Sequence, residues 1–316
     1  MCGIVGYLGN RVAQDALIDG LRRLEYRGYD SAGAAFYDGN AFSLARETGR
    51  VENLAATLRE SNPTSTLGIA HTRWATHGAV TVSNTHPHLS HDGKIALVHN
   101  GVIENYGPLK RILEGKGIEF SSETDSEVLS NLIAYHYARL EGEEDRFAQA
   151  LREALSQCRG AYGIAVLCVD EPGFLLGARR GSPLVVGLGD GETFLASDAS
   201  AFVGRVRDAV YLKDGEIALL REDGFRIITM QGEDAQAVSQ PIDQTVEDVE
   251  MGDFDSFMEK EIFEQPVALE NTLRGRFGED GTTAKLGGLE GHEDELRRLD
   301  RIVFVACGTA RHSCLV

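Results

Sequence analysis

Short apolar segments bounded by turn signals run through the first part of the chain, and their lengths limit the folds that it can adopt. Some have the length and composition of strands, and others repeat apolar residues at helical spacing. We expect strands at residues 3–8, 32–37, 67–70 and 95–98, and helices at residues 12–24, 106–113, 124–140 and 146–155. Helices and strands are therefore mixed along the chain, which permits a fold that layers both kinds of element.

The segment from residue 163 to about residue 228 differs from the first part because it is rich in strands. Asp-Gly dipeptides, which favour tight two-residue turns, divide it. They predict hairpin turns at Asp190-Gly191, Asp214-Gly215 and Asp223-Gly224.

Beyond about residue 240 the apolar periodicity fades and acidic residues accumulate, which is typical of a linker or an exposed connection. Residues 258–266 predict a helix that Pro266 ends, and residues 293–299 predict another helix. Residues 302–306 have the composition of a buried strand, and the Gly-Thr turn after them is typical of the start of a phosphate site in a parallel-sheet domain. The seven residues that follow are too few to complete a domain, so we expect a second domain that is cut short.

Charge and composition argue against several classes of function. The chain has 49 acidic and 31 basic residues, a formal net charge of −18, and such a field repels phosphate backbones and anionic membrane surfaces. We therefore expect neither nucleic acid nor a membrane as a partner. No apolar run approaches the ~20 residues of a membrane helix, and the start lacks the pattern of a signal peptide, so we expect a cytoplasmic location.

The cysteines are five, an odd number, and none has CxxC spacing, so neither a disulfide framework nor a zinc ribbon is predicted. Cys2 stands out because it follows Met1 directly. Removal of Met1 would leave a thiol and an α-amine on one residue, and an amine with a pKa of ~7.7–8.0 can relay a proton from the thiol. Gly3, which has no Cβ, would leave room for a substrate beside the sulfur. Position alone favours the alternative, an incidental cysteine.

Further motifs lie in separate segments. The chain reads MCGIVGY at its start, LEYRGYDSAG at residues 24–33, HTRWATHG at 71–78, HNG at 99–101 and SETD at 122–125. Together with VHNGVIEN, SETDSEV and EKEIFEQP, these motifs resemble the glutamine–fructose-6-phosphate aminotransferase family, within the N-terminal nucleophile amidotransferases. The match runs from Met1 to the last residue. CGIVG alone would also suit amidophosphoribosyltransferases, asparagine synthetases or glutamate synthases.

The resemblance implies an α+β fold, a four-layer αββα sandwich in which two antiparallel sheets pack face to face with helices outside. It implies a glutaminase domain at residues 2–240, a linker at 241–285 and the truncated start of an α/β sugar-isomerase domain at 286–316. The glutaminase would release ammonia from L-glutamine, and the full-length enzyme would use it to convert fructose 6-phosphate to glucosamine 6-phosphate. No cofactor and no metal are implied, and a homodimer would form through the sugar-isomerase half.

The resemblance also implies roles for single residues. Cys2 would be the nucleophile, Asn100 and Gly101 would form the oxyanion hole, Arg73 would clamp the α-carboxylate of glutamine, and Asp125 would take its α-ammonium. Other interpretations stand beside these roles. Asn100-Gly101 is also a common hairpin turn, and we expect a tight turn to position this pair; Asp125 also suits a helix start capped by Thr124.

Other implied roles concern the borders of the site. Thr76 and His77 would lie on a loop that closes over glutamine, and Trp74 would gate the passage of ammonia, although composition alone favours an ordinary core tryptophan. Thr309 would contact the sugar phosphate. The family usually has serine at the next position, where this chain has Ala310.

Arg27 and Asp30 would hold the surroundings of the nucleophile together. Six of the nine histidines fall between residues 71 and 99, yet without an HExxH motif a metal site is not favoured over buried, hydrogen-bonded histidines. Two rival functions remain: another amidotransferase with an N-terminal cysteine, such as a purine-pathway enzyme, and a non-catalytic module that binds glutamine and regulates.

Overall fold

The computed structural model divides the chain into two compact units, Met1–Glu250 and Met251–Val316. It describes residues 2–74, 78–142, 145–222, 224–242, 245–249, 252, 254–277, 284–285, 287–289, 291–306 and 308–315. Within the described residues, none of the helices is long and apolar enough to cross a bilayer.

The first unit is built on two antiparallel sheets. The eight-stranded sheet has the order β14-β11-β9-β10-β1-β4-β2-β3, and the six-stranded sheet has the order β13-β12-β8-β7-β6-β5. The larger sheet contains β1 (Gly3–Gly9), β2 (Ser31–Tyr37), β3 (Phe42–Thr48), β4 (Leu67–Arg73), β9 (Val185–Leu188), β10 (Glu192–Ala196), β11 (Asp208–Tyr211) and β14 (Ser239–Pro241). The smaller contains β5 (His88–Leu89), β6 (Ile95–Ile103), β7 (Gly160–Cys168), β8 (Leu175–Arg180), β12 (Glu216–Arg221) and β13 (Gly224–Thr229).

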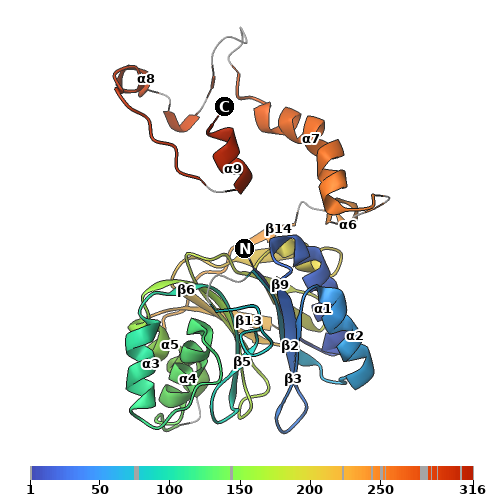
Figure 1. Cartoon of the computed structure of the whole chain (residues 1–316), viewed down its shortest axis with the longest axis vertical. Coiled ribbons are helices and arrows are strands. Elements are labelled where there is room, and N and C mark those ends of the chain that lie inside the picture. Colours follow the sequence, from blue (N-terminus) through green and yellow to red (C-terminus); the bar gives the residue numbers. More distant parts are fainter. Residues whose placement is uncertain are drawn as a thin grey trace. The chain divides into compact units, whose positions relative to one another are not determined.

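Helices cover the outer face of each sheet (Figure 1). The larger sheet packs against α1 (Ala13–Leu24) and α2 (Val51–Ser61), and the smaller sheet packs against α3 (Tyr106–Glu114), α4 (Asp125–Tyr137) and α5 (Arg146–Gln157). A third apolar cluster joins the inner faces of the two sheets. The four layers are therefore helix, sheet, sheet and helix, as the sequence motifs implied.

Alternation along single strands sorts side chains between these layers. In β6, Ile95 and Leu97 face the helices, while Ala96 and Val98 face the other sheet. Because successive side chains point to opposite faces of a strand, both faces of a central strand must be apolar when both are covered. The continuous apolar run at residues 95–98 in the first unit is therefore a strand buried on two sides.

The strands and helices predicted for the first part of the chain are present, with ends shifted by a few residues. The strands β3 and β5 and the helix α2 were not predicted. Asp190-Gly191 joins the paired strands β9 and β10, so that hairpin is confirmed. The hairpin at Asp214-Gly215 is wrong, because β11 and β12 on either side of it belong to different sheets. β12 and β13 pair as expected, and Asp223 between them lies outside the described residues.

The second unit differs from its prediction in two places. Its main helix, α7 (Phe257–Leu273), continues through Pro266, so the helix end predicted there is wrong. A proline inside a helix removes one backbone hydrogen bond, and this can bend the helix without ending it. The run 302–306, expected as a buried strand, is exposed and not assigned to a strand, and Val305 is 91% exposed. An apolar run becomes a buried strand only where another strand pairs with it, and the described residues supply no such partner here. The predicted helix near 293–299 is confirmed only over α8 (Glu293–Leu296), and α9 (Gly308–Ser313) follows.

Candidate active site

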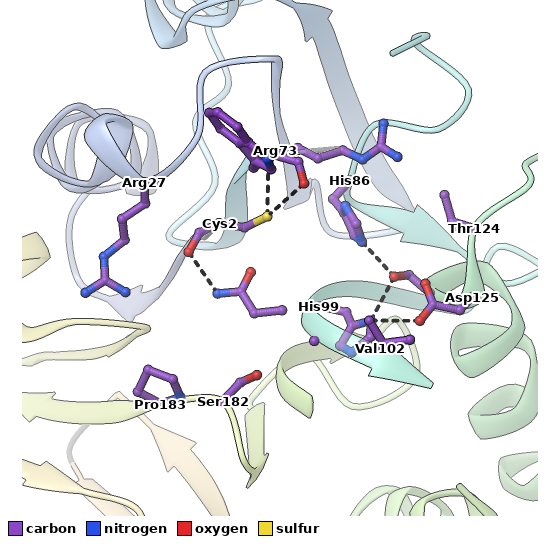
Figure 2. A pocket seen from close by; sticks show the side chains of 14 residues that line it. Cys2, Arg27, Arg73, His86, His99, Val102, Thr124, Asp125, Ser182 and Pro183 are labelled. Carbon is purple, nitrogen blue, oxygen red and sulfur yellow. Dashed lines mark hydrogen bonds and ion pairs between the residues drawn. The ribbon is translucent and has the colours of Figure 1, made fainter. Parts of the chain in front are cut away.

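A cavity of about 250 Å³ opens where the two sheets meet the start of α4 (Figure 2). Its walls come from the residue before β1, the end of β4, the far part of β6, the first turn of α4 and the loop after β8. The lining residues are Cys2, Arg27, Arg73, Trp74, His86, His99, Asn100, Gly101, Val102, Thr124, Asp125, Ser126, Ser182 and Pro183. Segments far apart in the sequence thus converge on one space.

Cys2 lies directly before β1, beside the end of the neighbouring strand β4. The Trp74 N–H donates to the Cys2 sulfur over 3.1 Å, and the thiol lies 3.6 Å from the Trp74 carbonyl oxygen. Burial raises the pKa of the Cys2 thiol, while the Trp74 N–H and the charge of Arg73 act in the opposite direction. A thiol of this kind needs a base before it can attack, because only the thiolate is nucleophilic.

Gly3, the next residue, has a different role from the one that we expected. A Cβ at Gly3 would lie 2.7 Å from the Leu24 Cβ and 2.8 Å from the Thr72 hydroxyl. The absence of a side chain therefore lets α1 approach β1 and β4, and the expectation that it makes room for a substrate is wrong. The close packing fixes the strand that carries Cys2.

Asn100 and Gly101 lie inside β6, so the turn expected at this dipeptide is wrong. Asn100 pairs with Gly163 and Gly101 with Tyr162, and the ladder with β7 runs on beyond both. Gly101 has φ +125°, and a Cβ there would lie 2.1 Å from the Ala161 carbonyl oxygen. Glycine is needed at this position of the strand, because residues with a side chain rarely adopt this backbone conformation and a Cβ would clash with β7.

The Asn100 side chain reaches across to the other sheet. Its Nδ2 donates to the Cys2 carbonyl oxygen over 3.1 Å, the bond drawn beneath Cys2 in Figure 2. Its Oδ1 lies 3.0 Å from Nε2 of His71 on β4. Amide N–H donors close to the nucleophilic residue are the groups that an oxyanion hole requires.

Arg73 and Trp74 end β4, next to Cys2. Arg73 is only 3% exposed and donates through Nη1 to the Ala79 carbonyl oxygen over 3.2 Å. Burial lowers the pKa of its guanidinium, while the charges of Cys2, Asp30 and Asp125 oppose that shift. Trp74 is 45% exposed, so the expectation of an ordinary core tryptophan is wrong.

Asp125 is the first residue of α4. Thr124 caps this helix, because its hydroxyl accepts from the Glu127 N–H over 3.2 Å, as predicted. In a capping box the Glu127 carboxylate would also accept from the Thr124 N–H. Here it accepts from the N–H and the hydroxyl of Ser122 instead. Asp125 is 5% exposed, and its Oδ2 accepts from the Ile103 N–H over 2.7 Å. This backbone contact anchors one side of the carboxylate at the cavity wall.

The histidines beside the cavity are held by contacts with side-chain hydroxyl groups. The Ser126 hydroxyl lies 2.8 Å from Nε2 of His86 and 2.9 Å from Nδ1 of His99. His88 contacts the Thr124 hydroxyl over 3.0 Å. Burial holds the pKa of His86 well below its usual value and lowers that of His88 to about 3. Within the described part of the chain, no group of three or more His, Cys, Asp or Glu side chains is arranged to hold a metal.

The remaining predicted residues lie as follows. Arg27 forms an ion pair with Asp198, and the Asp30 N–H donates to the Arg73 carbonyl oxygen over 3.0 Å, so both tie together segments around Cys2. Thr76 and His77 lie outside the described residues. Thr309 lies on α9 of the second unit, and its side chain is outside the described part of the structure.

Several residues of the cavity wall were not predicted from the sequence. His86, His99, Ser126, Ser182 and Pro183 line the cavity but were not proposed as site residues. A signal for His99 was available, since alternation from Leu97 turns it toward the helices and hence toward the start of α4. Ser182 and Pro183 carried no signal, because they lie in the loop that connects β8 with β9, two strands of different sheets that are distant in sequence from Cys2.

Comparisons with known proteins agree with this geometry. A family model described as a glutamine amidotransferase domain matches residues 71–204. Over its whole length the chain is 45% identical to a glutamine–fructose-6-phosphate aminotransferase (isomerizing) of Chlorobaculum tepidum, of which it covers 52%. It is 47% identical to the protein of that name from Thermus thermophilus, of which it covers 50%. The chain therefore spans about half the length of the curated relatives it matches.

A solved structure supports the fold. The glutamine phosphoribosylpyrophosphate amidotransferase of B. subtilis is 26% identical, with a TM-score of 0.61 over 72% of this chain and 49% of that chain. The four-layer sandwich of the N-terminal nucleophile amidotransferases is thus confirmed, and so is the resemblance that the motifs indicated.

Proposed function

We propose that this chain hydrolyses L-glutamine to glutamate and ammonia with Cys2 as the nucleophile. Its residues 71–204 match a glutamine amidotransferase domain, and its relatives carry the name of a glutamine-dependent enzyme. One observation carries the proposal. Cys2, Arg73, Asn100, Gly101 and Asp125, chosen for their chemistry and their motifs, all line a single cavity although they come from four separate segments.

The reaction would proceed through a thioester. The Cys2 sulfur attacks the side-chain amide carbon of glutamine, and the oxygen that gains charge is held by the Asn100 amide and the Gly101 N–H. A proton passes to the nitrogen, ammonia leaves, and water then hydrolyses the thioester to glutamate. Each donor of this kind is worth roughly 100-fold to 1000-fold in kcat in comparable sites.

The proton carrier would be the α-amine of Cys2 itself, after removal of Met1. Its ordinary pKa of ~7.7–8.0 lies near neutral pH, where a base is most useful. The raised pKa of the thiol supports the need for such a base. Intact mass spectrometry shows whether Met1 is present. A protein that retains Met1 and still has full glutaminase activity would exclude this part of the mechanism.

Charged groups would select free glutamine. Arg73 would donate to the α-carboxylate and Asp125 would accept from the α-ammonium, because a guanidinium fork and a carboxylate match these two ions. Both side chains are buried at the cavity, where water screens their charges little. Thr76 and His77 remain predicted contacts on a closing loop.

The product ammonia would serve hexosamine synthesis. The relatives are named for converting fructose 6-phosphate, and we extend that substrate to the protein from which this chain derives. Trp74 would gate the ammonia, and Thr309 would contact the sugar phosphate. The proposed domains are 2–240, 241–285 and 286–316, with homodimers formed through the sugar-isomerase half and a cytoplasmic location.

Ammonia release tests the glutaminase. Wild type, Cys2→Ala and Cys314→Ala are compared, because Cys314 is a free cysteine of the second unit and serves as the matched control. We expect Cys2→Ala to lose the activity and Cys314→Ala to keep it. Equal rates for wild type and Cys2→Ala would exclude the proposal.

Two alternatives have distinct signatures. A glutamine sensor would bind glutamine, yet its processed form would not be modified at Cys2 by a diazoketone that mimics glutamine. Another amidotransferase would release ammonia as proposed but transfer it to a substrate other than fructose 6-phosphate. The parent protein, supplied with glutamine and fructose 6-phosphate, distinguishes this second case by whether an amino sugar forms.

A further inference from the structure

We propose that His71 is a positioning residue that turns the Asn100 amide so that its NH2 group, and not its oxygen, faces the reacting centre. The inference rests on the proposed glutaminase function. It concerns a contact between the two sheets that the motif-based assignment of site residues does not include.

Strand alternation brings the two side chains together. In β4, Leu67 and Ile69 point into the cluster between the sheets, so His71 points the same way. In β6, Ala96 and Val98 point into that cluster, which turns Asn100 toward His71. The two residues stand at the end of the inter-sheet core nearest Cys2, and their polar atoms meet over 3.0 Å.

The contact decides how the amide lies. The two ends of an asparagine amide have almost the same shape and differ only in that one donates and the other accepts. Burial lowers the pKa of His71 to about 3, so its ring is neutral and carries one N–H. An N–H at Nε2 pairs with Oδ1 of Asn100, and this leaves Nδ2 to donate to the Cys2 carbonyl oxygen over 3.1 Å.

The other tautomer is disfavoured by its surroundings. Nδ1 of His71 is buried and has no hydrogen-bond partner among the described residues. A proton there would be a buried donor without an acceptor, which costs more than a bare lone pair at the same place. The proton therefore resides on Nε2. The surroundings of Nδ1 thus determine that Nε2 donates, and the N–H at Nε2 in turn sets the direction of the Asn100 amide.

A reversed amide would oppose catalysis. If Nε2 of His71 were an acceptor, Asn100 would donate to it and present Oδ1 toward the Cys2 side. A carbonyl oxygen in that place repels a developing oxyanion, whereas an N–H stabilises it. His71 thus acts through Asn100 and has no contact with the substrate of its own.

Two variants of His71 test the role. His71→Gln keeps an N–H donor near the Nε2 position, and His71→Leu removes the donor while keeping a similar volume. We expect His71→Leu to lower kcat for glutamine hydrolysis by roughly 100-fold with KM changed less than about 3-fold, and His71→Gln to stay within about 10-fold of wild type. Iodoacetamide alkylation of Cys2, followed by peptide mass, should proceed at the wild-type rate in both, since this reaction forms no oxyanion.

A double variant separates positioning from a merely structural effect. In an Asn100→Ala background there is no amide left to orient, so adding His71→Leu should cost less than about 3-fold more in kcat. An additive loss in the double variant, or slowed Cys2 alkylation, would assign His71 to packing and overturn the proposal. Wild-type kcat in His71→Leu would overturn it as well. Absence of ammonia release by wild type would instead refute the proposed function itself.

Discussion

The two compact units of the chain place their apolar side chains in opposite ways. In the first unit, strands such as β1, β6 and β7 bury almost every side chain, and Leu195 is 0% exposed. In the second unit, Met258 is 73%, Phe263 67% and Phe304 68% exposed. Large apolar side chains therefore occur in both units, and their presence in a segment does not by itself mean that the segment is buried.

The difference shows what the first unit has in addition. Each of its sheets has two covered faces, and glycines such as Gly3 and Gly101 allow close approach where segments cross. That close packing holds buried charges and polar groups of the candidate site in fixed positions, at a cost that a well-packed scaffold can offset. Chemistry and a dense core therefore belong to the same unit.

Removal of a buried charge at the cavity should have the largest effect. We expect Arg73→Gln to lower kcat/KM for glutamine by roughly 100-fold to 1000-fold, because the α-carboxylate loses a buried, paired donor. Arg297→Gln, at an exposed position of the second unit, should leave kcat/KM within about 2-fold. Steady-state kinetics check both. A loss confined to kcat, with KM unchanged, would contradict the assigned role in binding.

Glycines with positive φ offer a second contrast. Gly101→Ala would place a Cβ 2.1 Å from the Ala161 carbonyl oxygen, and we expect about 100-fold loss of kcat together with lowered stability. Gly275 has φ +71°, and a Cβ added there would meet no atom within 4 Å, so Gly275→Ala should cost only about 1 kcal/mol of local strain. Kinetics and denaturant unfolding are the measurements. Equal losses of kcat and stability in the two variants would contradict the claim that close packing at Gly101 excludes a side chain.

Leucine truncation compares the two units directly. Leu195→Ala should lower the free energy of unfolding of the first unit by about 2–5 kcal/mol, because it opens a cavity in the core between the sheets. Leu269→Ala, at a site that is 61% exposed, should change it by less than about 0.5 kcal/mol. Urea unfolding followed by circular dichroism reports both values. A large effect at Leu269 would mean that α7 is covered in solution.

Acid should destabilise the first unit through its buried histidines. The folded pKa of His71 and of His88 is lowered to about 3, against about 6.5 in an unfolded chain. Between these values the unfolded state binds more protons, so stability falls as the pH falls below about 6.5, by up to ~1.4 kcal/mol per pH unit for each histidine. His88→Gln should remove the contribution of one histidine, so the free energy of unfolding should fall less steeply, by up to ~1.4 kcal/mol per pH unit. Unfolding measured at pH 7 and at pH 5.5 checks this. An unchanged slope would show that His88 is not buried neutral.

Much of the first unit was predictable because local patterns and burial agree there. The strands around residues 3–8 and 95–98 have continuous apolar runs, and the structure covers both of their faces. Thr124 was readable as a helix cap because capping depends on neighbours in sequence. The residues that carry the candidate chemistry were identified by motif resemblance, and their meeting in one cavity could not be derived from spacing alone.

Three of the errors share a physical origin, because each depended on a partner distant in sequence. Asn100-Gly101 reads as a turn until β7 is seen to continue the ladder beside it. Asp214-Gly215 reads as a hairpin until the flanking strands are assigned to different sheets. The run 302–306 reads as a buried strand until no neighbour is found for it among the described residues.

The single strand β6 supplies both faces of the candidate site, and this restricts how the segment can vary. Asn100 looks toward Cys2, while His99 looks toward Ser126 at the start of α4. Loss or gain of one residue between Ile95 and Asn100 would move every following side chain of β6 to the opposite face of the sheet, so that Asn100 would no longer point toward Cys2. Length changes in this stretch should thus be absent among functional descendants of the chain, whereas its aliphatic side chains remain open to replacement by others of like size.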